Sequence, residues 1–202
     1  MIRDRLFEMQ DTGYRDFQSR LMPEIPEEKI IGVRTPALRK LAKELAGTEK
    51  AAAFISQLPH KYYEENNLHA FLVCEIKDYD RCIAEVERFL PYIDNWATCD
   101  CFAPEAFKKH RAEVYAKIKQ WLRASEIYTV RFGIVTLMDY LKADFEEQML
   151  SLVADIRSEE YYINMAIAWY FSMALVWQHD AALPYLLEER LDKWTHNKSI
   201  QK

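Results

Sequence analysis

The sequence has 202 residues, of which half are apolar, and its formal net charge at pH 7 is −5. This length allows one sizeable hydrophobic core, and we expect a single domain over residues 1–202. Only four glycines occur, and no two lie close enough to form a phosphate-binding loop, which argues against a Rossmann or P-loop nucleotide site. We expect no cofactor.

The cysteines and the apolar stretches argue against three further classes of protein. None of the four cysteines forms a C-x-x-C pair, and no histidines stand at metal spacing, so neither a metal site nor a disulfide framework is indicated. The longest apolar stretch, Ala166–Trp177, is interrupted by Ser172 and is shorter than the ~20 residues that cross a bilayer. We expect a cytoplasmic monomer without a membrane partner.

Helical spacing of apolar residues runs through almost the whole chain, and no alternating strand pattern is bounded by turn signals. The sequence therefore predicts an all-α protein. Two short helices, near Leu6–Met9 and Tyr14–Leu21, end at the first prolines; the next has Thr35 as N-cap and Pro36 as its first residue and stops near Gly47. Further helices are predicted at about 49–57, 61–77, 80–90, 103–108, 110–122, 125–141, 144–155, 159–177 and 180–190, with Pro59, Pro91, Pro104 and Pro184 near breaks or in first turns.

The connections between these helices are short, which favours either a compact bundle or a helical-repeat solenoid. Trp96 and Arg131 are 35 residues apart, and Arg131 and Trp169 are 38 apart, a step typical of two-helix repeats of the HEAT type. We therefore predict a HEAT-like solenoid whose concave face carries these three residues, although two intervals alone could also arise by coincidence.

Charge is distributed unevenly along the sequence. Residues 29–43 contain five cations and no acid, namely Lys29, Arg34, Arg39, Lys40 and Lys43, and residues 108–123 contain six cations and one acid. Acidic residues, among them Glu64 and Glu65, collect elsewhere. Because a phosphate backbone interacts with the face presented to it, this segregation allows nucleic-acid binding despite the negative net charge, although solvated helix faces would give the same counts.

Trp96 and Asp100 stand four residues apart in the stretch 94–102, so on a helix their side chains share a face. A core tryptophan beside a capping or ion-paired aspartate is one interpretation. The other is a surface on which a positive charge that develops during a reaction is held between an indole and a carboxylate.

Arg131 and Trp169 lie in otherwise apolar helices. An arginine among core positions needs an anion, which would be either a buried carboxylate or an external phosphate. Trp169 follows the aromatic run Tyr161-Tyr162, where core packing is the ordinary role of a tryptophan. Taken singly, both residues are explained by structure alone.

The ordered set of motifs resembles the AlkD-like DNA alkylation repair family of HEAT-repeat DNA glycosylases. The resemblance covers nearly the whole chain and rests on Gly32-Val33-Arg34-Thr35-Pro36-x-Leu38-Arg39-x-Leu41, Trp96-x-x-x-Asp100, Arg131, Tyr162-Ile163-x-x-Ala166-Ile167-x-Trp169 and Asn197-Lys198-x-Ile200-Gln201-Lys202. It implies excision of positively charged N3- or N7-alkylated purines from duplex DNA, with Asp100, Trp96, Trp169 and Arg131 as the catalytic set. It also implies DNA contacts from Arg34, Arg39, Lys40, Lys43 and Lys198.

The chain departs from the family pattern around the second tryptophan. Positions where active members of the family tend to carry a Lys, a Gly and an Arg-Glu pair are here Met165, Ala168 and the uncharged run Phe171-Ser172-Met173. A glycosylase is the leading hypothesis. The alternatives are a non-catalytic helical-repeat protein that binds DNA or RNA, and a protein-binding solenoid.

Overall fold

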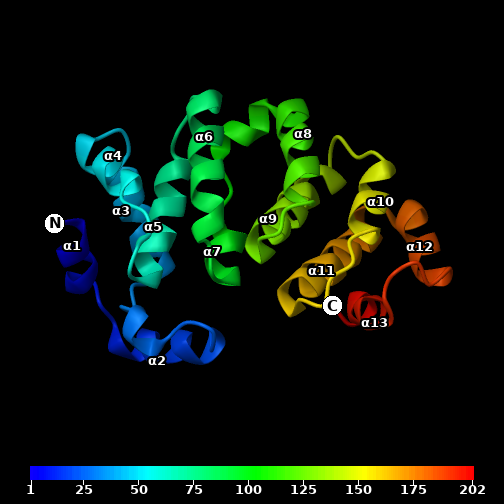
Figure 1. Cartoon of the computed structure of the whole chain (residues 1–202), viewed down its shortest axis with the longest axis horizontal. Helices are drawn as coiled ribbons and strands as arrows, with labels where there is room; N and C mark the ends of the chain where they lie inside the picture. The colour runs from blue at the N-terminus through cyan, green and yellow to red at the C-terminus, as the bar shows by residue number, and fades with distance from the viewer. The chain divides into compact units, whose positions relative to one another are not determined.

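The computed structural model describes residues 1–202, and all of its regular elements are helices (Figure 1). The predicted all-α class is confirmed, because no residue forms a β-strand. No helix is both long enough and apolar enough to cross a bilayer. The chain divides into two compact units, Met1–His110 and Arg111–Lys202. The continuous repeat domain over residues 1–202 stays a prediction.

The first unit holds seven α-helices and three short 3-10 turns. The helices are α1 (Ile2–Glu8), α2 (Thr12–Leu21), α3 (Thr35–Leu45), α4 (Glu49–Ser56), α5 (Tyr63–Cys74), α6 (Tyr79–Phe89) and α7 (Trp96–Cys101), and the turns are η1 (Glu27–Lys29), η2 (Leu90–Tyr92) and η3 (Glu105–Lys109). Several of these helices have a polar N-cap residue whose side chain accepts a backbone N–H of the first turn. These N-caps are Asp11, Thr48, Asp78 and Asn95.

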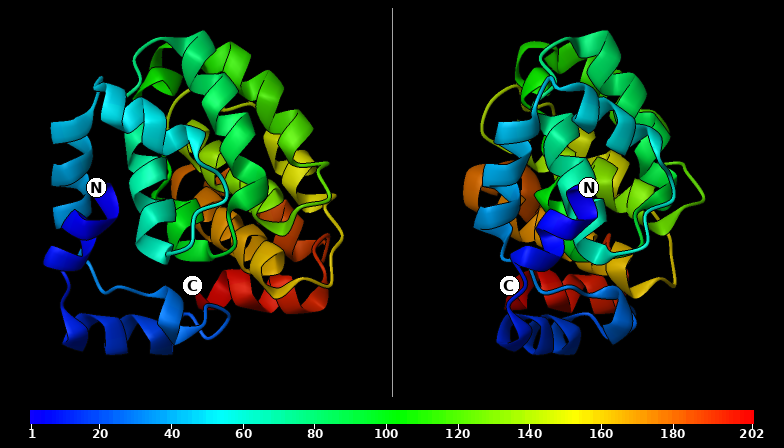
Figure 2. Two further views of the ribbon diagram at one scale, coloured as in Figure 1. Left: turned by 60° about the vertical axis from the view of Figure 1, so that its left-hand side comes forward. Right: turned by 90° about the vertical axis from the view of Figure 1, so that its left-hand side faces the viewer.

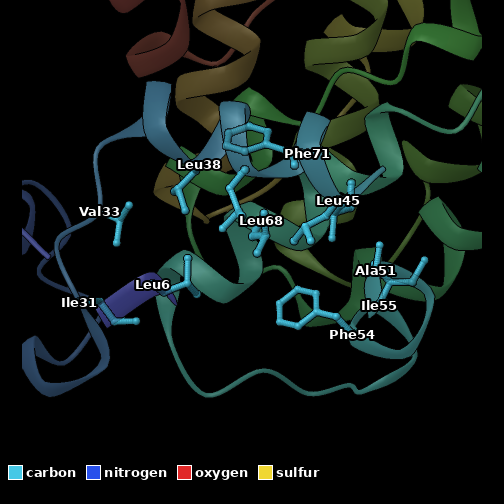
Figure 3. Packing of buried hydrophobic residues seen from close by; sticks show 13 residues of the cluster. Leu6, Ile31, Val33, Leu38, Leu45, Ala51, Phe54, Ile55, Leu68 and Phe71 are labelled. Carbon is cyan, nitrogen blue, oxygen red and sulfur yellow. The ribbon is translucent and has the colours of Figure 1, made fainter. Parts of the chain in front are cut away.

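Helix α5 is the central element of the first unit. All twelve of its residues are buried, and it packs against α3, α4, α6 and α7. Its apolar residues Leu68 and Phe71 join a cluster with Leu38 and Leu45 of α3 and Phe54 of α4 (Figure 3). Helices α3, α5 and α7, which alternate with α4 and α6 along the chain, therefore pack in a row: α3 lies against α5, and α5 lies against α7.

The second unit repeats this arrangement of alternate helices. It consists of α8 (Arg111–Trp121), α9 (Ile127–Met138), η4 (Asp139–Leu141), α10 (Gln148–Ala154), α11 (Tyr161–Trp177), α12 (His179–Leu187) and α13 (Lys193–Gln201). Helix α11 packs against α9 on one side and α13 on the other, and the views in Figures 1 and 2 show α13 alongside α11. Stacking of alternate helices within both units is the packing of a helical-repeat solenoid.

Several local expectations were wrong. Helix α13 was not predicted, because its sequence KWTHNKSIQ has no apolar period; it is held instead by small buried residues, Thr195 and Ser199, on its inner side. Pro184 lies inside α12 and not near a break. Helix α3 has Arg34 as N-cap and Pro36 in its second position, one residue away from the expected start, where a missing N–H is still tolerated.

Candidate active site

Helix α7 carries the first two predicted catalytic residues. It has only six residues, begins at Trp96, and is capped by Asn95, whose Oδ1 accepts the Thr98 N–H at 2.8 Å. Trp96 and Asp100 are one turn apart and both half-buried, whereas Thr98 and Cys99 are fully buried. The predicted shared face of Trp96 and Asp100 is therefore formed by this helix, at a partly open surface.

A chain of buried polar side chains connects α7 to α5 and α2. Thr98 Oγ1 donates a hydrogen bond to Asn67 Oδ1 at 2.7 Å, and Gln18 Nε2 donates to the Tyr63 hydroxyl at 3.2 Å. Burial raises the pKa of Tyr63, and its hydrogen bond with Asn67 opposes that shift. A helix of six residues is not stable by itself. The position of α7 is therefore fixed by these hydrogen bonds and by its packing on α5.

Trp96 packs against a small apolar cluster from the region before α3. The cluster consists of Met22, Ile25, Ile30 and Tyr63, and Trp96 and Ala97 cover it. Ile25 lies within the Pro23–Lys29 connection and Ile30 follows it directly, so this connection forms part of the support for the indole. Part of the Trp96 ring thus belongs to the core, as the structural interpretation of this residue requires.

Arg39 of α3 lies close to the C-terminal end of α7. Its guanidinium stacks over the Phe71 ring, with 4.3 Å between the guanidinium carbon and the ring centroid. Burial raises the pKa of the Cys101 thiol, and Arg39 opposes this while the Asp100 carboxylate adds to it. A predicted DNA-binding cation and the predicted catalytic carboxylate therefore lie near the same thiol.

The glycine of the Gly32-Val33-Arg34 motif is required by close packing. Gly32 has φ +94°, and an added Cβ would lie 2.5 Å from the Asp11 carbonyl oxygen and 2.7 Å from Arg15 Cβ. The buried Glu64 carboxylate accepts the backbone N–H groups of Ile31, Gly32 and Val33 at 2.8, 2.6 and 3.2 Å. The motif therefore fixes the entry to α3.

Glu64 and Glu65 were grouped in the sequence with the acids expected on a segregated surface, and that placement was wrong. Glu64 is 0% and Glu65 2% exposed. Burial raises the pKa of Glu64 while its three backbone hydrogen bonds lower it, and Glu65 binds Arg3 at 2.8 Å and caps α5. The only feature of the sequence that could indicate the burial of these two carboxylates is the polar run Glu64–Asn67, which leads directly into an apolar helix.

The remaining predicted DNA-binding cations of the first unit differ in their surroundings. Lys40 and Lys43 are exposed on α3. Arg34 is exposed as well, but it forms an ion pair with Asp11 at 2.8 Å and lies over the Tyr14 ring at 5.0 Å. A phosphate would have to compete with Asp11 for Arg34, so Lys40 and Lys43 are the more accessible contacts.

Arg131 of α9 is buried, with 6% of its surface exposed. Its Nη1 donates a hydrogen bond to the Tyr162 carbonyl oxygen in the first turn of α11, at 2.7 Å. One of its acceptors is thus a backbone carbonyl, and not the carboxylate or phosphate expected from the sequence. This bond joins α9 to α11 and uses one of the five guanidinium N–H donors.

Trp169 lies near the middle of α11 and is half-buried. Its backbone carbonyl accepts the Ser172 hydroxyl at 2.8 Å, and Lys202 Nζ lies 5.5 Å from the centroid of its ring. Core packing, the ordinary expectation for this residue, therefore accounts for only part of its surface. Lys198 is half-buried on the neighbouring α13.

Comparison with known families adds the decisive observation. The sequence model of the DNA alkylation repair enzyme family matches residues 2–199. The chain belongs to this family. No curated protein matches it. In this DNA alkylation repair family member, the structure places the Trp96–Asp100 pair on α7 of the first unit and the Arg131 and Trp169 side chains on the packed helices α9 and α11 of the second. Convergence of all four on one surface stays a prediction.

Proposed function

We propose that the protein is a DNA glycosylase that removes positively charged N3- or N7-alkylated purines from duplex DNA. Its family membership supports a role in DNA alkylation repair. The observation that carries the finer proposal is the placement of Trp96 and Asp100 on one partly open face of α7, held by buried contacts. No metal or nucleotide is needed for the reaction proposed.

The chemistry suits a carboxylate beside an indole. An alkylated purine that is already cationic is a good leaving group, so the reaction depends on stabilising the positive charge that develops on the sugar. An ionised Asp100 near the anomeric carbon would stabilise that charge and orient the attacking water. Trp96 would cover the sugar with its π face, a contact worth about 0.5–2 kcal/mol for a cationic partner.

The second unit would contribute binding rather than charge stabilisation. Trp169 would pack against the sugar from α11, and Arg131 would hold a neighbouring phosphate. Arg39, Lys40 and Lys43 of α3, with Arg34 and Lys198, would contact the backbone and fix the position of the duplex.

The direct test is release of 7-methylguanine from a duplex that contains one such lesion. We expect the wild-type protein to release the base and the Asp100→Asn variant, which keeps the shape but loses the charge, to be slower by at least 100-fold, on the order of the effect of other charge-stabilising groups. The matched control is Asp80→Asn, an exposed aspartate of α6, which should match wild type. Equal release by the wild-type and Asp100→Asn proteins would end the proposal.

A second candidate is a nucleic-acid-binding protein without glycosylase activity. It is favoured by the absence of any charged residue in α11 and by the bond of Arg131 to a backbone carbonyl, since both weaken the expected hold on a lesion. This candidate predicts salt-dependent binding of duplex DNA together with no base release above the spontaneous rate.

A further inference from the structure

Helix α11 carries Trp169 but no charge. None of its seventeen residues is Asp, Glu, Lys or Arg. A tryptophan that packs against a nucleotide sugar lies close to the phosphate bonded to that sugar, so a cation beside the indole would strengthen the contact. In this chain such a cation has to come from another helix.

Helix α13 brings lysines to this position. Two contacts join it to α11: the rings of Trp194 and Tyr161 are 5.8 Å apart, and Lys202 Nζ lies 5.5 Å from the Trp169 ring. Tyr161 and Trp169 are eight residues apart, and so are their partners Trp194 and Lys202. The two segments therefore run side by side in the same direction for about 12 Å. Lys198 lies between the two contacts, one turn before Lys202.

All charged side chains on this pair of helices are positive. Residues 161–177 and 193–202 contain three lysines and no acid, although the whole chain carries a net charge of −5. Trp194 and Lys198 are four residues apart and share one face of α13, and Lys202 follows four residues later as its C-cap, with its N–H bonded to the Lys198 carbonyl oxygen. Lys193 lies on a different face, about 100° away from Trp194.

We infer that Lys198 of α13 and Lys202, the residue that caps this helix, form a phosphate-binding edge beside Trp169, which supplies the positive charge that α11 lacks. The edge binds the backbone of duplex DNA and carries no base specificity. Lys202 keeps its alkyl stem against the indole while its ammonium group turns to a phosphate, a division that long cationic side chains permit. Trp194, exposed by 45% and in edge contact with Tyr161, is the aromatic end of the same edge.

This inference rests on the proposed DNA-binding function, and its test separates the two. Binding of a fluorescein-labelled duplex is measured by anisotropy between about 50 and 200 mM NaCl, where each phosphate contact contributes roughly 0.9 to the slope of log K against log salt. We expect Lys202→Ala to reduce that slope by about 0.9 and Lys198→Ala/Lys202→Ala by about 1.8. Lys202→Arg should keep the wild-type slope, because the charge remains.

Lys193→Ala is the matched control, since it removes an exposed lysine of the same helix from another face, and its slope should equal that of wild type. If the wild-type protein binds DNA but Lys198→Ala/Lys202→Ala has the slope of Lys193→Ala, the edge is refuted together with the Lys198 contact, whereas the proposed base release, which is measured separately, still stands. Tighter binding by Lys202→Ala would also refute it, because Lys202 would then be blocking Trp169. A loss of slope in a protein that releases no 7-methylguanine would support the edge while the glycosylase proposal failed.

Discussion

Helices α5 and α11 are central to their respective units, yet they use polar and apolar residues in opposite ways. Every residue of α5 is buried, including Glu64, Glu65 and Asn67. Helix α11 has no charged residue, and nevertheless Trp169 is half-buried and Val176 is 69% exposed. Burial in this protein therefore does not follow the polarity of the sequence.

The difference lies in where each helix finds its partners. Glu64 of α5 accepts backbone N–H groups, and Asn67 accepts the hydroxyl of Thr98 on α7, so the burial of these two groups fixes the entry to α3 and the position of Trp96 and Asp100. The exposed side of α11 instead offers aromatic and apolar surface, to which α13 adds charge. The first unit therefore buries polar contacts that hold its helices in place, whereas α11 in the second leaves apolar surface exposed.

The largest expected effect on stability comes from removing the buried Glu64 carboxylate in the first turn of α5. Glu64→Ala leaves three buried N–H groups without their acceptor, so we expect the free energy of unfolding to fall by about 3–5 kcal/mol. Urea unfolding followed by circular dichroism would measure it. Glu28→Ala, at an exposed carboxylate of η1, should stay within about 0.5 kcal/mol of wild type. Similar losses in both variants would contradict a structural role for Glu64.

The next effect tests a histidine pair formed by the buried His69 of α5 and the half-buried His60, which precedes this helix. His60 Nε2 and His69 Nδ1 are 2.9 Å apart, and the rings stack on Phe54 and Phe89, respectively. Burial lowers the pKa of His60 to about 4 and that of His69 to about 2; the nearby Glu65 carboxylate raises the first, and Arg3 and Arg88 lower it.

Both folded-state pKa values lie below the ordinary value near 6.5, so the unfolded chain binds more protons. Stability is therefore fully present above about pH 6.5 and is lost as the pH falls toward 4. Between pH 6.5 and 5, before most carboxylates titrate, we expect the two histidines together to lower the free energy of unfolding by about 3 kcal/mol. His179→Gln, at an exposed histidine, should give the same pH profile as wild type. A flat profile between pH 6.5 and 5 would show that this pair is not buried in its neutral form.

The smallest effect tests the link between α5 and α7. Thr98→Val keeps the shape of the side chain but removes the hydroxyl that donates to Asn67, so we expect a loss of about 1–2 kcal/mol, while Thr98→Ser should lose clearly less. Hydrogen exchange of the α7 amides would report the loosening locally. Identical exchange in the two variants would mean that packing alone positions Trp96 and Asp100.

The helical class and the shared face of Trp96 and Asp100 could be predicted, because both depend on local spacing. The four-residue interval between Trp96 and Asp100 places them on one face of any helix, and Thr35-Pro36 marked the start of α3 to within one residue. The partners of these residues could not be predicted. Arg131 meets the carbonyl oxygen of Tyr162, 31 residues later, and a carbonyl leaves no mark in a sequence.

The sequence by itself determined that the chain is all-helical, that α11 is an apolar helix, and which side chains of α7 share a face, since each follows from a period of 3.6 residues within one segment. Only the tertiary structure decided that Glu64 is buried, that α13 is a helix, and that Lys202 lies at Trp169. Burial and pairing are properties of surfaces that segments distant in sequence make together. Glu64 needs the backbone of residues 31–33, and Trp169 receives its cation from 33 residues further along the chain.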